Sequence, residues 1–332
     1  MTLKNKKQTK RQFVITDPLD RMLEALGWLY YARADQITRL LYSPSSLTFV
    51  RAHLKRLCDE NYVKSISIYS GSKPTPLIYT LSSKGMEYLK GTGRIPEDRR
   101  FRPSEVEVSP FFLPHTLDVN DFLIAFSSLA KQDRRFQMIS RMHDIDLKRE
   151  KRLEKDRVVF TKLVGDAVVE KKMYLYPDAF LLLSMEREGT GESGQPLKPR
   201  KFGLWLEIDR NSETDARKFK DRVRGIVSYH SSGKYEEKYG TKSLVVAYLI
   251  TQGGHHRMEV LRDLARLELA STNEKAHTSR MFRFIVVPSS WDYLDLEKKT
   301  GSPFAVAKAL LLESGWAVPF VDHDLMPLLV TK

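Results

Sequence analysis

Apolar residues over 17–57 recur with a helical period. Asp17-Pro18 is typical of a helix N-cap followed by a first-turn proline. The apolar stripe of the helix predicted after it consists of Leu19, Met22, Leu23, Leu26 and Leu29. The pattern predicts a second, short helix over 34–41 and a third from about residue 45. The third helix has its own apolar stripe, formed by Leu47, Val50, Leu54 and Leu57.

The apolar period changes from helical to two after Asn61. Alternating residues over 62–68, a turn at 71–74 and a return through 77–81 predict a β-hairpin, and a short helix follows around 85–89. Three helices and a hairpin in this order are the elements of a winged helix-turn-helix. We therefore interpret residues 17–92 as a winged helix-turn-helix domain, with the third helix as its recognition helix.

Positive charge is concentrated in this part of the chain. Residues 1–103 contain 19 Lys and Arg against 9 Asp and Glu, a net of +10 out of +13 for the whole chain. A basic module of this kind favours a polyanionic partner, because neutralising phosphates releases counterions. The single cysteine, Cys58, excludes an internal disulfide, and no apolar run is long enough to cross a membrane. These features are typical of a cytoplasmic protein.

The polar face of the third helix supplies the candidate contacts to double-stranded DNA. Arg and Lys suit guanine edges and phosphates in the major groove, and lysines of the wing suit the backbone. The predicted DNA-binding residues are Thr48, Arg51, His53, Lys55 and Arg56 in the helix and Lys64 and Lys73 in the wing. A basic flexible arm is expected over 1–16. Winged helices also serve as protein-interaction modules, so this alternative stays open.

A linker over 93–110 is predicted to lead into a second domain, 111–332, of the α/β class. Helices and strands are expected there in the order α-β-β-β-α-β, extended by a further α-β. The predicted elements are a helix at 112–130, strands near 135–147, 172–184 and 201–209, a helix at 213–231, a strand at 244–250, a helix at 256–270 and a strand at 282–287. This order indicates a mixed sheet covered by helices on both faces.

Three carboxylates lie close to the ends of two of these strands. Asp178 follows Pro177 within the second strand, and Glu207 and Asp209 point to one face of the third because they are two residues apart. Convergent carboxylates of this kind suit Mg²⁺ or Mn²⁺, which would polarise a phosphate and activate water. We therefore regard Asp178, Glu207 and Asp209 as candidate metal ligands and catalytic residues.

The chain resembles two known groups of proteins through these motifs. The element order with Pro177-Asp178 and Glu207-x-Asp209 resembles the PD-(D/E)XK nuclease superfamily. Over roughly 17–250 the chain is similar to the replication-relaxation family, through His115-Thr116-Leu117-Asp118-Val119-Asn120-Asp121, Pro177-Asp178-Ala179 and Leu206-Glu207-Ile208-Asp209-Arg210. The resemblance implies a DNA-binding protein of a plasmid or other mobile element, acting in its replication, maintenance or transfer, with a nuclease-like second domain.

The chain departs from the nuclease pattern at its last position, where Asp209 replaces the lysine that positions water. A helical projection of 213–231 places Lys220 at the edge of the apolar stripe and Lys218 away from it, so Lys220 is the candidate replacement. Lys220 lying along the core edge with a solvated ammonium is the alternative. In helix 112–130 the same projection turns His115 inward and Asp118 beside it. Both are candidate catalytic residues, although a buried histidine more often only satisfies a hydrogen bond.

The missing lysine favours a nuclease-like domain that has lost catalysis and serves DNA binding or assembly. An active metal-dependent DNA endonuclease is the first alternative. A winged-helix transcriptional regulator with a sensor or assembly domain is the second. Double-stranded DNA is the expected partner, with a homodimer or proteins encoded by the same element as further candidates, and no membrane.

Overall fold

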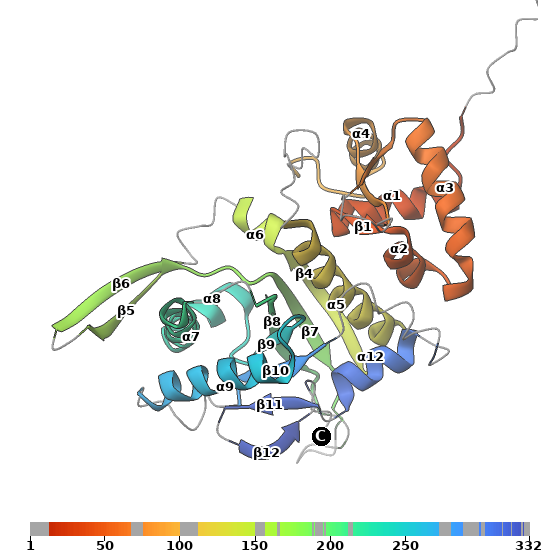
Figure 1. Ribbon diagram of the computed structural model, residues 1–332. Helices are drawn as coiled ribbons and strands as arrows, with labels where there is room; N and C mark the ends of the chain where they lie inside the picture. The colour runs from red at the N-terminus through yellow and green to blue at the C-terminus, as the bar shows by residue number, and fades with distance from the viewer. Residues whose placement is uncertain are drawn as a thin grey trace, which may run out of the picture. The chain divides into compact units, whose positions relative to one another are not determined.

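The chain forms two compact units, residues 1–107 and 108–332. The computed structural model describes residues 13–67, 76–99, 112–149, 157–164, 167–187, 189, 195, 197–211, 215–271, 280–287, 299, 303–313, 315–319, 321–326 and 328. Both units mix helices and strands, which confirms the predicted α/β class (Figure 1). None of the helices in these ranges is long and apolar enough to cross a membrane.

The first unit contains four α-helices and a small antiparallel sheet among its described residues. Its elements are α1 (Asp17–Leu29), β1 (Ala32–Arg33), α2 (Ala34–Leu41), a 3-10 turn (Pro44–Ser46), α3 (Leu47–Asp59), β2 (Val63–Ile66), β3 (Ile78–Leu81) and α4 (Ser83–Gly91). The strands are ordered β1-β3-β2. The predicted helices agree closely with α1 to α4. The short strand β1 was not predicted, and the predicted turn at 71–74 lies outside the described residues.

The apolar stripes identified in the sequence form the core of this unit. Leu19, Leu26, Leu54 and Leu57 are completely buried. The unit is closed by α4, whose N-cap Ser82 accepts a hydrogen bond at Oγ from the Gly85 amide at 3.1 Å. A side chain at Gly85 would put its Cβ 2.3 Å from the Tyr62 carbonyl oxygen, so only glycine fits where α4 meets the hairpin.

The second unit is built on a mixed seven-stranded sheet. The elements are α5 (Phe112–Gln132), β4 (Phe136–His143), α6 (Asp144–Arg149), β5 (Arg157–Val164), β6 (Ala167–Tyr174), β7 (Ala179–Met185), β8 (Arg200–Asp209), α7 (Ala216–Ser231), α8 (Lys234–Tyr239), β9 (Leu244–Ile250), α9 (Gly254–Ala270), β10 (Phe282–Val286), α12 (Pro303–Leu312), β11 (Trp316–Val318) and β12 (Val321–Met326). The sheet order is β12-β11-β10-β9-β8-β7-β4, with β8, β9 and β10 parallel and the remaining neighbours antiparallel.

Helices lie on both sides of this sheet, as its buried strands predicted (Figure 1). Trp205 of β8 and Val246 of β9 are register partners and belong to one core with residues of α7 and α9. Leu204 and Leu206 point to the opposite face and are equally buried. On that side α5 contacts β8 and packs against α12. The C-terminal end of β8 therefore lies between two helical layers.

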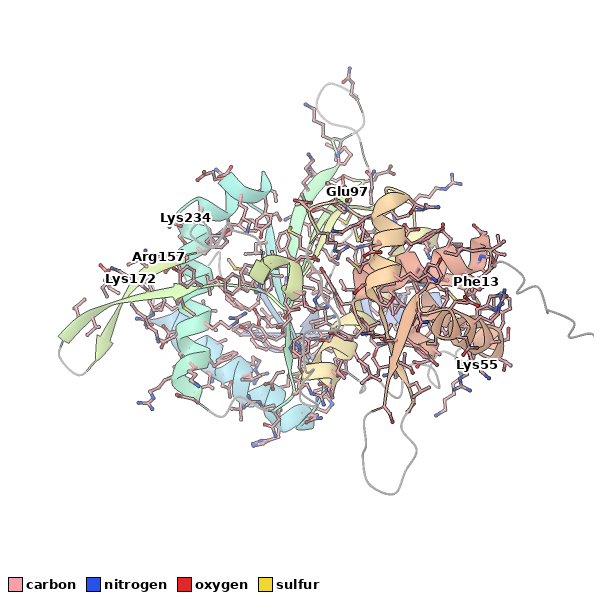
Figure 2. All side chains as sticks on the ribbon, turned by 90° about the horizontal axis from the view of Figure 1, so that it is seen from above. Phe13, Lys55, Glu97, Arg157, Lys172 and Lys234 are labelled. Carbon is pink, nitrogen blue, oxygen red and sulfur yellow. The ribbon has the colours of Figure 1, made fainter. Side chains whose placement is uncertain are left out.

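Two predicted strands had wrong bounds, and one hairpin was not predicted. The strand expected to reach residue 147 ends at His143, just before α6, and the strand expected over 172–184 is two strands separated by residues 175–178, which include Pro177. The β5–β6 hairpin was not predicted. It is a separate two-stranded sheet whose inner residues Val158 and Phe160 are buried, and it extends beyond the main sheet (Figures 1 and 2).

Candidate functional site

The three carboxylates predicted from the strand ends lie around one cavity of about 510 Å³ in the second unit. The register that pairs Ala179 with Leu206 brings the start of β7 against the end of β8. The Asp178 amide donates to the Leu206 carbonyl at 2.9 Å, and this places Asp178 beside Glu207. Glu207 and Asp209 follow on one face of β8, as their spacing predicted. The pairing of β7 with β8 therefore brings Asp178, Glu207 and Asp209 to one cavity, as expected from their places at the strand ends.

Asp178 is paired with His115 from α5. The His115 Nε2 lies 3.1 Å from Asp178 Oδ2, and the same oxygen accepts a hydrogen bond from the Ile208 amide at 2.7 Å. Burial opposes the charged imidazole, but Asp178 outweighs it and holds the pKa of His115 above its usual value. Burial likewise opposes the Asp178 anion, yet His115 and the amide keep the pKa of that carboxyl below its usual value. Both groups are therefore stabilised in their charged forms.

Glu207 is paired with Arg222 from α7. Arg222 Nη2 donates to Glu207 Oε1 at 2.5 Å and also to the Tyr176 carbonyl. The Trp205 indole donates to the same Glu207 oxygen. Burial raises the pKa of Glu207 to about 7, while the Arg222 charge lowers it. One Glu207 oxygen thus accepts hydrogen bonds from both Arg222 and Trp205. Their effect on the pKa of Glu207 is smaller than that of burial, so the pKa stays raised.

Asp209 is paired with Arg257 from α9 in a two-pronged arrangement. Arg257 Nε and Nη2 donate to the two Asp209 carboxylate oxygens at 2.7 and 3.1 Å. Such forked geometry is the strongest form of an Arg–carboxylate contact. Asp118, from α5, accepts hydrogen bonds at one oxygen, Oδ2, from Arg210 and from the Thr251 hydroxyl, the latter at 3.2 Å.

The basic residues around the cavity differ from those expected. Its described lining includes Lys171 and Lys218 but not Lys220. The projection placed Lys220 nearer the apolar stripe than Lys218, and the burial agrees, since Lys220 is half-buried and Lys218 is exposed. The lysine of α7 that lines the cavity is nevertheless Lys218, and a role for Lys220 stays a prediction. Lys171, on β6, is paired with Asp221.

Sequence reasoning also missed Arg222, Arg257 and Tyr248. Arg222 carries a detectable signal, because it lies three residues after Phe219 and four before Ile226 and so interrupts an apolar helix face. Arg257 has no local signal, since it meets Asp209 from 48 residues away. Tyr248 is the register partner of Glu207 and lines the cavity, and burial raises the pKa of its hydroxyl well above the usual value.

A divalent cation would have to compete with these basic side chains for the carboxylates, since Arg257 takes both oxygens of Asp209 while His115 and Arg222 each contact one oxygen of Asp178 and Glu207. Mg²⁺ and Mn²⁺ bind several oxygen ligands at once. Asp178, Glu207 and Asp209 each contact a separate cationic side chain instead. Within the described residues no group of three or more His, Cys, Asp or Glu side chains is arranged to hold a metal ion. The arrangement does not fit a bound divalent cation, and the metal prediction stays a prediction.

The second candidate surface is the exposed face of α3 in the first unit. Thr48, Arg51, Lys55 and Arg56 are exposed there, and Lys64 is exposed on β2; Lys55 is labelled in Figure 2. His53 is half-buried, with its ring against that of Phe49, and its Nδ1 donates to the Phe49 carbonyl at 2.9 Å. Lys73 lies outside the described residues. The predicted helix residues thus share one helix, and all but His53 are fully accessible.

Comparison with known families matches residues 23–245 to the replication-relaxation model. The chain belongs to the replication-relaxation family. No curated protein sequence gives a significant match. Membership confirms the resemblance derived from the motifs and points to replication or transfer of a plasmid or other mobile element.

The region that matches the replication-relaxation family includes most of both candidate surfaces. It contains all of α3, the three carboxylates and Arg222, and it ends within β9. Arg257, which pairs with Asp209, lies beyond it. The family match therefore extends over the basic helix and the strand-end acids, but one of the three basic partners comes from outside the matched segment.

Proposed function

We propose that this member of the replication-relaxation family binds double-stranded DNA through a winged helix-turn-helix in its first unit. The observation that carries the proposal is the exposed face of α3, where Arg51, Lys55 and Arg56 occur in a unit with most of the net charge of the chain. The sheet order β1-β3-β2 behind this helix is compatible with a wing formed by β2 and β3. Lys64 would then contact the backbone from the wing.

Family membership supplies the setting for this activity. We propose that the DNA belongs to a plasmid or other mobile element, and that the protein acts in its replication, maintenance or transfer. A homodimer or another protein of the same element remains a candidate partner.

Replacing Arg51, Lys55 and Arg56 together with alanine tests the role of α3. Affinity of the full-length protein for a mixed-sequence duplex should fall, and the slope of log affinity against log salt should flatten by about 1 for each phosphate that is no longer neutralised. Fluorescence anisotropy over a salt series measures both. The matched control replaces Lys172, Lys201 and Lys242, which are exposed lysines of the second unit. An equal loss of affinity in the control would contradict a specific role for α3.

We further propose that the second unit is a nuclease-like fold that does not cut DNA. Its elements α5, β4, β7, β8, α7 and β9 follow the α-β-β-β-α-β order expected of that fold once α6, the β5–β6 hairpin and α8 are treated as insertions. In this proposal His115, Arg222 and Arg257 provide the positive charge that a catalytic metal ion would otherwise provide. The carboxylates then connect helices to the end of the sheet.

An active Mg²⁺- or Mn²⁺-dependent endonuclease is the second candidate, because three carboxylates and Lys218 line one cavity. Incubating supercoiled DNA with the protein and Mn²⁺ separates the two proposals, with Asp178→Asn as the matched variant. We expect no nicking above that of Asp178→Asn and no Mn²⁺ binding by calorimetry. Cleavage by the unaltered protein that Asp178→Asn abolishes, while the urea midpoint of the variant is unchanged, would establish the enzyme instead.

A further inference from the structure

The exposed face of α3 carries apolar groups as well as the basic ones. The Phe49 ring is 41% exposed, and Ala52 is also exposed. Both lie in the N-terminal part of the helix, next to Thr48 and Arg51. At about 100° per residue Thr48 and Ala52 lie near the centre of the exposed helix face, with Phe49 on one side of them and Arg51 on the other. The apolar groups of Phe49 and Ala52 are therefore neighbours, and Arg51 flanks them across Thr48. We call these four exposed residues the α3 patch: Thr48, Phe49, Arg51 and Ala52.

Phe49 is held in place by aromatic neighbours. The centre of its ring lies 4.0 Å from the centre of the His53 ring, with the two planes tilted by 40°. It lies 5.5 Å from the centre of the Tyr42 ring, which it meets edge-on. His53 is itself anchored by its hydrogen bond to the Phe49 carbonyl. The Tyr42 ring is in turn contacted by the guanidinium of Arg21, 5.5 Å from the ring centre. The exposed ring is thus presented in one orientation, which lowers the entropy lost on binding a partner.

We propose that the α3 patch reads thymine, with Phe49 and Ala52 contacting C5-methyl groups in the major groove while Arg51 contacts a neighbouring guanine or phosphate. The thymine methyl is the apolar group on the major-groove edge, and alanine, threonine methyl and phenylalanine are the side chains that contact it. The first turns of a recognition helix are the part that reaches base edges. This inference rests on the proposed DNA binding and adds a base preference to it.

Charge favours DNA over a protein as the occupant of this patch. Arg51, Lys55 and Arg56 are exposed on the same helix, and Lys64 is exposed on the neighbouring strand. This unit, residues 1–107, contains 19 Lys and Arg against 11 Asp and Glu, a net of +8, so a polyanion is attracted to the unit as a whole. The apolar groups of the patch then distinguish between base pairs, and the cations supply affinity that does not depend on sequence.

The test replaces thymine by uracil, which removes the methyl and leaves the hydrogen-bonding groups in place. The full-length protein selects duplexes from a pool with a randomised core, and the selected duplex is resynthesised with deoxyuridine at each thymidine of the site. Because burial of one methyl group corresponds to about a fourfold change in affinity, we expect uracil to weaken binding by about fourfold for each thymine methyl that the patch buries. Phe49→Ala should weaken binding to the thymine duplex similarly and should remove the part of the uracil effect that Phe49 contributes, while the part contributed by Ala52 remains.

Leu267→Ala is the matched control, because Leu267 is an exposed apolar residue on α9 of the second unit. It should leave both the affinity and the uracil effect unchanged. Phe49→Leu keeps an apolar side chain and should retain part of the effect, and thermal melting checks that each variant is folded.

Each outcome of the test is decisive. A uracil effect of the same size in Phe49→Ala and in the unaltered protein would overturn thymine reading by Phe49. Binding with no uracil effect, or selection of no preferred sequence, would overturn it as well and would favour a protein as the partner of the patch. Absence of any salt-dependent DNA binding would instead overturn the proposed function itself.

Discussion

Arg257→Gln removes the basic partner of Asp209 and tests whether the strand-end carboxylates are structural. The substitution keeps a polar side chain of similar length but leaves the Asp209 carboxylate without its forked hydrogen bonds. Asp209 and Arg257 are only 10% and 14% exposed, so water replaces the missing donors poorly. If arginine neutralises this acid, the second unit should be strongly destabilised.

The expected magnitude follows from burial of the pair. Removing one member of a buried ion pair costs about 3–5 kcal/mol, because the remaining charge is left without compensation. Partial exposure of both side chains places the expected loss of stability near the lower end, at about 3 kcal/mol. Replacing both members, in Asp209→Asn with Arg257→Gln, should recover much of that stability, since no buried charge remains.

Urea denaturation followed by tryptophan fluorescence measures the change. Three of the four tryptophans, Trp205, Trp291 and Trp316, belong to the second unit, so the signal reports mainly on it. Arg217→Gln is the matched control, because Arg217 is 88% exposed and forms a surface pair with Asp215 that should contribute little. A destabilisation below about 1 kcal/mol for Arg257→Gln, or full rescue of the variant by Mg²⁺, would refute a structural role for this pair.

Two further changes follow from the same part of the molecule. Stability of the second unit should fall as pH rises from 4.5 through about 7, because the raised pKa of Glu207 makes the folded state bind its proton more tightly, and the raised pKa of His115 adds a further fall above pH 6.5; urea midpoints across both ranges measure the fall, and a stability that rises instead would contradict it. Gly203→Ala should destabilise the unit by more than about 1 kcal/mol in the same assay, the cost of overpacking, since the new Cβ would lie 2.1 Å from the Tyr235 hydroxyl and 2.6 Å from the Phe180 ring. Gly315→Ala in the same unit, whose new Cβ would meet only Ile285 at an ordinary 3.5 Å, is its control.

The first unit was the part most accessible to sequence reasoning, because its information is local. The stripe from Leu19 to Leu29 and the switch to alternation after Asn61 each define an element without reference to distant residues. The strand β1 was missed because it has no local pattern. It is two residues long, and it exists only because Ala32 and Arg33 pair with Tyr79 and Ile78, which are distant in the sequence.

The second unit shows where local patterns stop being sufficient. Alternation along β8 correctly placed Glu207 and Asp209 on one face, and the Pro177 break brought Asp178 to the same strand end. Alternation could not give the partners of these acids, because His115, Arg222 and Arg257 come from three different helices. In the β5–β6 hairpin, among the side chains that the structure describes, Val158 and Phe160 are buried while Val159 and Val168 are exposed. Apolar residues thus lie on both faces of the hairpin, and no one-sided apolar alternation marked it in the sequence.

The pairing of each carboxylate with a helix changes how a loss of function at these positions should be interpreted. Asp178 contacts α5, Glu207 contacts α7 and Asp209 contacts α9, so one cluster connects three helices to one end of the sheet. Alanine at any of the three acids removes a negative charge and also leaves a buried or half-buried cation without its partner. Lost DNA cleavage, or lost plasmid maintenance, would then follow from unfolding as readily as from lost catalysis. Only a variant that is inactive while its urea midpoint is unchanged can assign a chemical role to the acid. If every single replacement is destabilised and every paired replacement recovers, the cluster serves to hold the fold together.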